Sequence, residues 1–440
     1  MAVTERDSTT DVIDELGAWL EANWDPDLTC ADWWERLGLS GWAAPTLPEN
    51  AYGKGLSRND AVRVQTEISR FGALGAPAGL GLMLAAPTIA AHGSQEQIDL
   101  YIRDIVTGQK AWCQLFSEPG AGSDLAGLTT RAERDGDEYV VNGQKVWTSA
   151  GQIADLGMLL ARTNFDVPKH QGITWFAIDM HQPGIEVRPL RELTGRAMFN
   201  EVFMSDARVP ADAIIGDLNT GWAAANTTLA HERAGLGSGG GESGYGPAMP
   251  GTIAGFLDRR AGDYAPKSDA GRAASTSGRG GRGNSAKLLI DLAKGNGMIA
   301  DPSLRQGLMQ LYTLSEIGRI NGLRLKAEKA AGRDIPGMAN LSKLSMSEMM
   351  RLTRDLGLRI VGPAGMLHAY DGEGRKALDE ATGNPFLAMV TEMALFAQAP
   401  PIYGGTDQVQ RNIIGERVLG LPKEPNDDRT RPFSELPKNA

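Results

Sequence analysis

The chain has 440 residues, 42% hydrophobic and 22% charged, which is typical of a globular protein with two or three packed domains. Its formal net charge of -10 argues against nucleic acid as a partner, because phosphate binding needs a basic surface. Two cysteines exclude a disulfide framework, the histidines are scattered, and no stretch has the roughly 18 apolar residues of a membrane span. We expect no metal site, no membrane insertion and, without a signal or transit peptide, a cytoplasmic protein.

Residues 1–110 predict an N-terminal helical domain. Apolar side chains recur at helical spacing, as at Val12, Leu16, Trp19 and Leu20, and glycine- and proline-rich segments separate the helical stretches.

Residues 111–215 predict a middle domain of short antiparallel strands. The pairs Asp135-Gly136 and Asn142-Gly143 favour the positive φ angles of tight hairpins, so each predicts a turn between two strands. Closely spaced strands of this kind indicate a small barrel or sandwich.

Residues 216–420 predict a C-terminal helical bundle, because apolar residues step by threes and fours along 304–320 and 341–360. Inside it, the Gly-, Ser- and Arg-rich segment 237–284 predicts a mobile surface insertion. Residues 421–440 predict a polar tail. The GxGxxG fingerprint of a Rossmann site is absent.

The segment from Ser117 to Asp124, SEPGAGSD, follows a predicted strand and combines glycines, a proline and hydroxyl groups. Such a loop could bring backbone N–H groups and hydroxyls against a flat polar ring, or it could be a plain strand-end loop. SEPGAGSD closely resembles the TEPxAGSD motif of acyl-CoA dehydrogenases. Three further segments resemble motifs of that family in the same order: 142–149 (NGQKVWTS), 200–210 (NEVF followed by RVP) and 402–411 (IYGGTDQVQR).

The resemblance covers nearly the whole chain and implies an α+β fold with N-terminal helices, a middle antiparallel β-domain and a C-terminal helical bundle. It also implies FAD between the last two domains. The implied reaction, typical of fatty acid or lipid catabolism, dehydrogenates the α,β-carbons of an acyl-CoA to a trans-2-enoyl-CoA. The implied electron acceptor is an electron-transfer flavoprotein.

By the same resemblance, Ser117 and Ser149 should hydrogen-bond the isoalloxazine ring, and Trp147 should shield it. Thr406 and Gln408 should meet the nucleotide part of FAD. The local sequence independently predicts Thr406 as a helix N-cap, and a helix N-terminus favours an anion such as the pyrophosphate of FAD. The implied cofactor-binding residues are Phe116, Ser117, Gly122, Ser123, Trp147, Ser149, Gly362, Gly365, Thr406 and Gln408. The implied substrate-binding residues are Ser123, Arg233 and Gly404.

The reaction needs a carboxylate base, and Gly404 stands where many family members carry it as the Glu of IYEGT. Glu232 continues an apolar helical stripe with Trp222, Ala225 and Leu229, where a carboxylate is costly unless it is paired or used. Burial should raise its pKa toward the range of a general base. Relatives resembling isovaleryl-CoA dehydrogenase hold the base at this place, just before an arginine. Alternatively, Glu232 pairs with an arginine and only steadies the bundle.

Two departures from the family concern the half of the FAD site that a neighbouring subunit supplies. The family's Arg-x-x-Phe-Gly segment is not found, and its QxxGGxG segment appears as RIVGPAG, residues 359–365. A homo-oligomer and a hetero-oligomer are both compatible with this pattern. Two alternative functions stay open, a non-catalytic partner subunit that completes a flavin site and an acyl-CoA oxidase. The small Gly404 favours a bulky acyl group.

Overall fold

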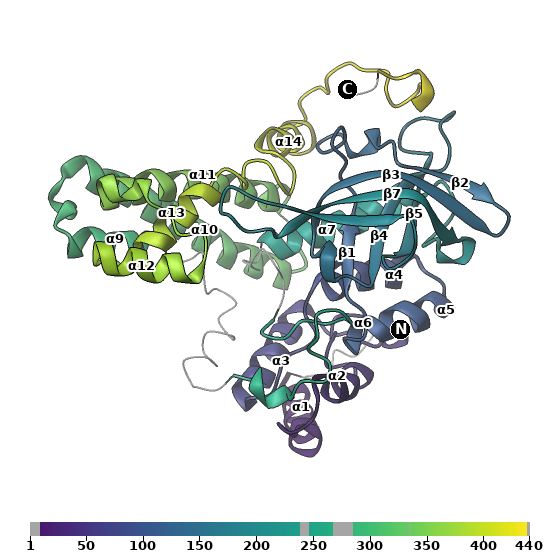
Figure 1. Ribbon diagram of the computed structural model, residues 1–440, viewed down its shortest axis with the longest axis horizontal. Coiled ribbons are helices and arrows are strands. Elements are labelled where there is room, and N and C mark those ends of the chain that lie inside the picture. Colours follow the sequence, from purple (N-terminus) through teal and green to yellow (C-terminus); the bar gives the residue numbers. More distant parts are fainter. Residues whose placement is uncertain (1–8, 238–245, 267–284, 334, 438–440) are drawn as a thin grey trace.

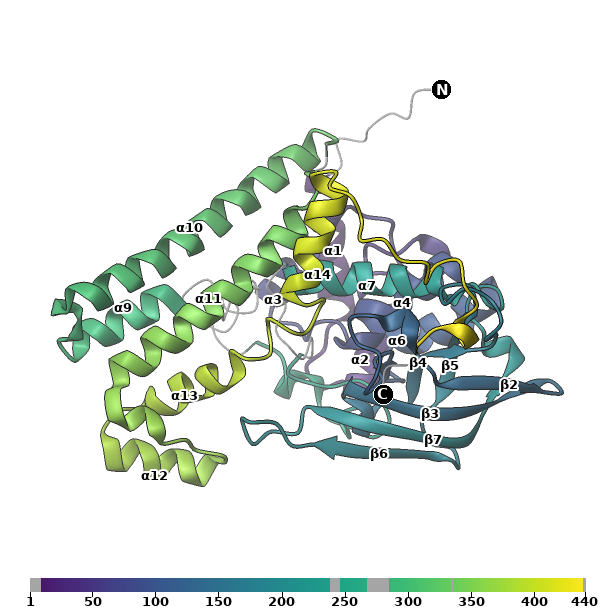
Figure 2. The same ribbon diagram turned by 90° about the horizontal axis from the view of Figure 1, so that it is seen from above.

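The computed structural model describes residues 9–237, 246–266, 285–333 and 335–437. N-terminal helices and a curled β-sheet form one body, and the C-terminal helices extend from it to one side (Figures 1 and 2). This arrangement confirms the predicted fold class. None of the helices in these ranges combines the length and apolar character needed to cross a membrane. The same ranges contain no group of three or more His, Cys, Asp or Glu placed to hold a metal ion.

The N-terminal helices pack around buried tryptophans. The indole N–H groups of Trp33 and Trp34 donate to the carbonyls of Leu74 (2.7 Å) and Gly75 (2.9 Å), which ties the second helix to the loop after the third. The helices are α1 (Thr9–Asn23), α2 (Cys30–Leu39), α3 (Arg58–Phe71), α4 (Ala86–His92), α5 (Gln95–Gln97) and α6 (Arg103–Val106), with π-helical turns at Gly81–Ala85 and Ile98–Ile102.

Seven strands form one sheet in the order β1-β4-β2-β3-β7-β6, with β5 paired to β4. The pairing is antiparallel except where β4 meets β1 and, at one residue pair, β2. The sheet is therefore mixed. Strand β1 can pair in parallel with β4 because the long chain between them, rather than a tight turn, connects the two strands. The strands are β1 (Trp112–Leu115), β2 (Arg131–Asp135), β3 (Glu138–Ser149), β4 (Leu156–Arg162), β5 (Ile173–Asp179), β6 (Ile185–Leu190) and β7 (Phe199–Pro210).

One of the two predicted hairpin turns is present. Asp135 pairs with Glu138 across a turn in which Gly136 has a φ of 64°, as predicted. The prediction for Asn142-Gly143 is wrong, because both residues lie inside β3 at an irregularity opposite β7. A Cβ atom at Gly143 would lie 2.3 Å from Thr130 Oγ1, so the glycine allows close backbone approach rather than a turn.

Helix α7 (Gly221–Gly237) is packed between β5 and α4, and it carries Glu232. A Cβ atom at Gly221 would lie 2.4 Å from the backbone nitrogen of Trp175, so only glycine allows α7 to start this close to β5. Farther along, the hydroxyls of Thr228 and Thr88 are 2.9 Å apart in the buried contact with α4. The contact at Gly221 holds the start of α7 against β5, and the contact at Thr228 holds its middle against α4.

Residues 246–266, which we call the strap, lie within the predicted mobile insertion and form specific contacts. The carbonyls of Leu257 and Arg259 accept hydrogen bonds from the start of α2, and the Asp155 carboxylate accepts bonds from the backbone N–H and the hydroxyl of Thr252. Residues 238–245 and 267–284 of the predicted insertion lie outside the described residues.

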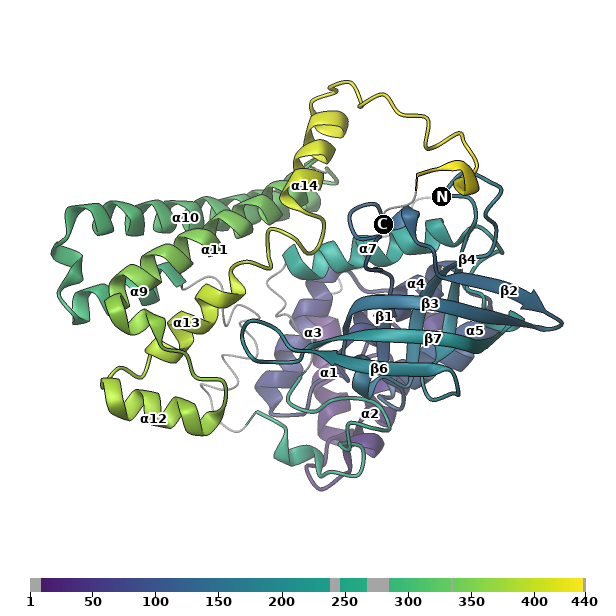
Figure 3. The ribbon, with the colours of Figure 1, turned by 45° about the horizontal axis from the view of Figure 1, so that its top comes forward.

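The C-terminal helices pack around a small core of their own, and residues 421–437 return to the β-sheet (Figure 3). In that returning segment Phe433 is buried, and the Arg162 guanidinium lies 3.5 Å from the centre of its ring. The predicted tail is polar and mostly exposed in its described part, and Phe433 docks it on the sheet. The helices are α9 (Ser285–Gly295), α10 (Pro302–Ala330), α11 (Met338–Val361), α12 (Gly372–Thr382), α13 (Leu387–Phe396) and α14 (Asp407–Ile413).

Candidate functional site

The loop after β1 and the end of β3 bring the first two motifs into contact. The loop closes on itself through two backbone hydrogen bonds of 3.0 Å between Glu118 and Ala121. From β3, the backbone N–H of Val146 donates to the Ser117 carbonyl at 2.9 Å, and Lys145 Nζ donates to the Phe116 carbonyl at 3.0 Å. Segments about thirty residues apart in sequence thus form one surface.

A buried ion pair braces this surface. Lys145 Nζ lies 2.9 Å from Glu118 Oε1, and the same carboxylate accepts hydrogen bonds from the backbone N–H groups of Thr129 and Thr130. Burial alone would raise the pKa of Glu118, but the charge of Lys145 and these hydrogen bonds outweigh it and lower the pKa to about 2. Burial lowers the pKa of Lys145, and Glu118 only partly offsets this. Glu118 therefore has a structural partner and is not free to act as a base.

Trp147 projects from this surface in an unusual backbone conformation. The pairing of β3 with β7 is irregular between Lys145 and Thr148, and Trp147 there has a φ of 62°, uncommon for a bulky residue. Its side chain is 62% exposed, with the ring centre 6.0 Å from that of Phe199. Strained, exposed aromatic residues of this kind occur where a ligand is bound.

The residues present fit an isoalloxazine ring. The exposed indole of Trp147 offers a flat apolar face, and the half-buried residues Ser117 and Ser149 offer hydroxyls from the same two segments. Ser123 and Gly122 lie exposed at the tip of the loop, and Phe116 is buried behind it. These residues would hold FAD on the side of the β-domain.

Glu232 lies near the end of α7, beside strand β1. Gln114 Nε2, in the middle of β1, donates to Glu232 Oε2 at 3.2 Å. Burial raises the pKa of Glu232, whereas the hydrogen bond from Gln114 and the charge of Arg233 partly offset that rise. Within the described residues, Gln114 is its only hydrogen-bonded side-chain partner, and no arginine forms an ion pair with it. The geometry does not support the alternative that Glu232 pairs with an arginine.

Sequence reasoning missed Gln114. The residue lies three positions before Ser117 in the strand that leads into the first motif, and Glu232 is 118 positions away. The motif itself was a signal to inspect this strand, but nothing local indicates which side chain meets α7. Part of the Arg233 side chain remains in contact with solvent, while the rest is surrounded by protein; this partial burial lowers the pKa of Arg233, the charge of Glu232 opposes the shift, and the charge of Arg417 adds to it.

Thr406 caps α14, as the local sequence predicts. Its hydroxyl accepts a hydrogen bond from the Val409 N–H at 3.2 Å. The next residue, Asp407, is buried and lies 3.1 Å from both Lys343 and Arg351 of α11. Just before the cap, Gly404 has a φ of 61°, and Gln408 is exposed on the first turn of α14.

The structure does not bring Gly362 and Gly365 to the rest of the predicted site. Both belong to the short turn Gly362–Met366 that follows α11, and Figure 2 shows the chain between α11 and α12 at the end of the bundle that is remote from α7.

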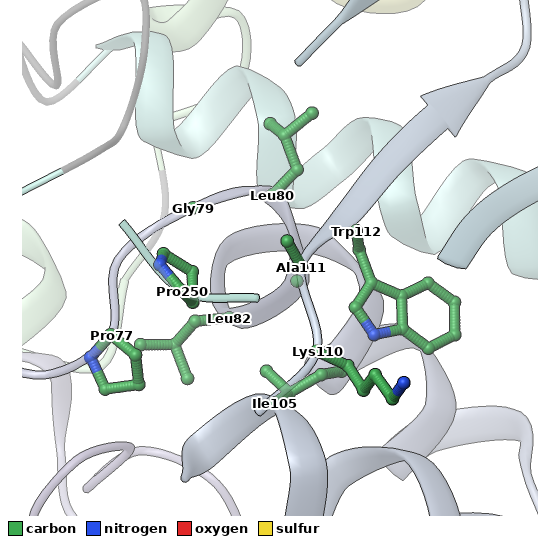
Figure 4. Close-up of a pocket in the computed structure, with 10 residues that line it drawn as sticks. Pro77, Gly79, Leu80, Leu82, Ile105, Lys110, Ala111, Trp112 and Pro250 are labelled. Atoms are coloured by element: carbon green, nitrogen blue, oxygen red, sulfur yellow. The ribbon is translucent and has the colours of Figure 1, made fainter. Parts of the chain in front are cut away.

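Two cavities lie near these elements. The first, under Pro250 of the strap and beside Trp112 of β1, is only about 10 Å³, close to the space for one water molecule (Figure 4). It is too small for an acyl group. The second, about 170 Å³, lies between the loop that joins β6 to β7 and helix α13. Its lining is Glu192, Thr194, Arg196, Met198, Met389, Glu392, Met393 and Phe396.

Three family profiles match the chain in order: "Acyl-CoA dehydrogenase, N-terminal domain" at residues 5–109, "middle domain" at 113–207 and "C-terminal domain" at 289–419. The chain is 34% identical over 392 residues to acyl-CoA dehydrogenase IpdE1 of Mycobacterium tuberculosis, covering 89% of this chain and 88% of that protein. It is 32% identical over 194 residues to mitochondrial isovaleryl-CoA dehydrogenase of Pongo abelii, covering 43% of this chain and 46% of that one.

Among solved structures, the ChsE4-ChsE5 complex from Mycobacterium tuberculosis aligns with a TM-score of 0.64 and 25% identity, over 96% of this chain and 100% of that one. The profiles cover all three parts of the chain, and IpdE1 matches nearly its whole length. The chain belongs to the acyl-CoA dehydrogenase family of FAD-dependent oxidoreductases.

Proposed function

We propose that the protein dehydrogenates the α,β-carbons of a CoA thioester to the trans-2-enoyl-CoA, with Glu232 as the base. The observation that carries this proposal is the position of the Glu232 carboxylate. It lies at β1, the strand that leads into the SEPGAGSD motif, and among the described residues its side-chain partner is Gln114 rather than a cation.

The raised pKa of Glu232 suits proton abstraction from a weakly acidic carbon. Glu232 takes the α-proton of the thioester, and bound FAD would supply the acceptor for the hydride that leaves the β-carbon. Ser117 and Ser149 orient the flavin ring, and Trp147 keeps water from one of its faces. Thr406 and Gln408 are proposed to meet the nucleotide part of the cofactor, and Ser123 the CoA portion of the substrate.

The lack of a carboxylate at Gly404 supports the same assignment of the base to Glu232. A glycine there supplies no carboxylate, so the base must come from another element, and α7 provides one beside β1. The resemblance to isovaleryl-CoA dehydrogenase, to which the chain is 32% identical over 194 residues, is consistent with a base on this helix, and the absent side chain at Gly404 favours a bulky acyl group. An electron-transfer flavoprotein is the proposed electron acceptor.

We further propose that the protein works as an oligomer, with either a second copy or a related subunit. Gly362 and Gly365 lie away from α7 and serve the flavin of a neighbouring subunit in this arrangement. Half-exposed apolar side chains along α10 support a subunit contact there: Met309, Tyr312, Ile317, Ile320 and Leu323. The alignment with the ChsE4-ChsE5 complex supports a related chain as the partner, and a second copy of this chain is the other arrangement.

The decisive experiment is anaerobic mixing of the purified yellow protein with a panel of acyl-CoAs, following the loss of flavin absorbance. Glu232→Gln should retain bound FAD and lose flavin reduction by at least about 1,000-fold, because the amide cannot take the proton. Glu133→Gln, an exposed carboxylate on β2, is the matched control and should be reduced at the wild-type rate.

Reduction of Glu232→Gln at the wild-type rate would exclude Glu232 as the base. A wild-type protein that is colourless alone and gains FAD only with a second chain would identify a partner subunit. Fast reoxidation by O₂ with release of peroxide would identify an oxidase.

A further inference from the structure

We propose that Gln114 is a positioning residue for Glu232, holding one carboxylate oxygen so that the other faces the α-carbon of the substrate. This inference rests on the proposed function, since it assigns the orientation of the same base. Gln114 touches neither the reacting carbon nor its proton in this scheme, and it acts through Glu232.

Strand β1 makes Gln114 a rigid anchor. The strand is paired along its length with β4, where Gln114 lies opposite Met158, and Cys113 and Leu115 on either side of Gln114 are buried. Two and three residues farther on, the carbonyls of Phe116 and Ser117 are held by Lys145 and Val146 of β3. One short segment therefore holds the base at one end and the flavin loop at the other.

An amide suits this position better than a cation. A neutral donor holds the Glu232 oxygen without adding the charge that would strongly stabilise the carboxylate and weaken it as a base. A carboxylate has two oxygens, and the bond from Gln114 occupies only one of them, Oε2. No described side chain bonds to the other oxygen, Oε1, which takes the proton in this scheme.

The amide can also remain paired after the proton has moved. With the proton on the other oxygen, Oε2 remains a hydrogen-bond acceptor, so the Gln114 N–H₂ group can donate to it in the ionised and in the protonated state. A leucine could donate in neither state. Replacing Gln114 should therefore change how the base titrates as well as where it points.

The test is the pH dependence of anaerobic flavin reduction in holoprotein carrying Gln114→Leu or Gln114→Glu. Both changes should move the midpoint of the profile to higher pH. The leucine removes a donor to the charged carboxylate, and the glutamate sets a second carboxylate beside it. At pH 7, reduction of Gln114→Leu should slow by about tenfold, with KM for the acyl-CoA changed less than about twofold.

Gln95→Leu is the matched control, because Gln95 donates to the exposed carboxylate of Asp99 at 3.0 Å, in the N-terminal helices. It should keep the wild-type midpoint and rate. If Gln114→Leu does not retain FAD, the pH profile of Gln114→Glu decides, because a glutamate side chain has the size of the glutamine that it replaces. A wild-type midpoint in the variants, or a rate that falls equally at every pH, overturns the proposal.

Glu232→Gln, measured in parallel, separates the two claims. A dead Glu232→Gln beside unshifted Gln114 variants overturns the positioning role and leaves the base assignment standing. A Glu232→Gln that is reduced normally overturns the base assignment itself.

Discussion

Glu118 and Lys145 are both buried, and their side chains are 2.9 Å apart. Removing one partner of such a pair strands a charge away from water, which typically costs about 3–5 kcal/mol. The pair therefore explains why a buried carboxylate stands in the SEPGAGSD loop after β1 without being available for proton transfer. It also links the first motif to the second, since Glu118 follows β1 and Lys145 belongs to β3.

The pH dependence of stability should reveal this carboxylate. The pKa of Glu118 is about 2 in the folded protein, against 4.5 for an ordinary glutamate. Its contribution, about 3 kcal/mol, is complete above pH 4.5 and is lost as the pH falls toward 2. Urea unfolding followed by circular dichroism should show Glu118→Gln destabilised at pH 7 and the difference from wild type shrinking in acid.

The exposed Glu133→Gln serves as the control and should leave the urea midpoint unchanged at every pH. A gap between Glu118→Gln and wild type that stays constant down to pH 3 would contradict the assigned pKa.

At the scale of elements, helix α7 decides where the base lies. Its first residue, Gly221, touches the backbone of β5, and its middle is held to α4 through Thr228. The helix rises about 1.5 Å per residue, so Glu232 lies roughly 16 Å along the axis from Gly221. A small displacement at the start of α7 should therefore reach the site.

Gly221→Ala should push α7 away from β5, because the added Cβ would lie 2.4 Å from Trp175 N and 2.6 Å from the carbonyl carbon of Thr174. We expect destabilisation of about 1–3 kcal/mol from overpacking, and flavin reduction about 10- to 100-fold slower from the misplaced base. Thermal melting and anaerobic stopped-flow measurements test the two effects.

Gly17→Ala is the control for that substitution, since a Cβ at Gly17 in α1 meets nothing within 4 Å. It should leave activity unchanged and raise stability by up to about 1 kcal/mol. Equal melting temperatures for Gly221→Ala and wild type would show that α7 can shift without cost.

At the scale of the whole molecule, two long-range segments join parts of the chain that are distant in sequence. The strap runs along the start of α2 and is anchored by Asp155, which also accepts a hydrogen bond of 2.8 Å from the Ala111 N–H. The returning segment 421–437 docks Phe433 against Arg162 of β4. Both lie on the body formed by the N-terminal helices and the sheet, and the C-terminal helices extend beyond them (Figure 3).

Removing the anchor should loosen the strap before it affects the rest of the fold. Asp155→Ala leaves the Thr252 hydroxyl and N–H without their acceptor, so local opening should become more frequent. Limited trypsin digestion should then cut faster after Arg259 and Arg260, at least about fivefold. The control is Thr382→Val, which removes a hydroxyl hydrogen bond inside α12 and should not change the rate of these cuts. An unchanged cutting rate in Asp155→Ala would show that other contacts hold the strap.

Local sequence was sufficient where a few neighbouring residues decide the backbone. The cap at Thr406 and the turn at Gly136 are such cases, because the hydroxyl acceptor and the positive φ act within three or four residues. The order of the four motifs was sufficient for the fold class. The roles of the individual cofactor-binding residues stay predictions.

Only the tertiary structure decided features that depend on contacts between distant residues. Asn142-Gly143 has the local preference of a turn, but pairing with β7 carries β3 straight through it. Phe433 lies in a polar segment and is buried only because Arg162 and Phe165 meet it across the fold. The bond from Gln114 to Glu232 joins β1 to α7, and no local pattern encodes it, because a side-chain amide has no preferred partner until packing supplies one.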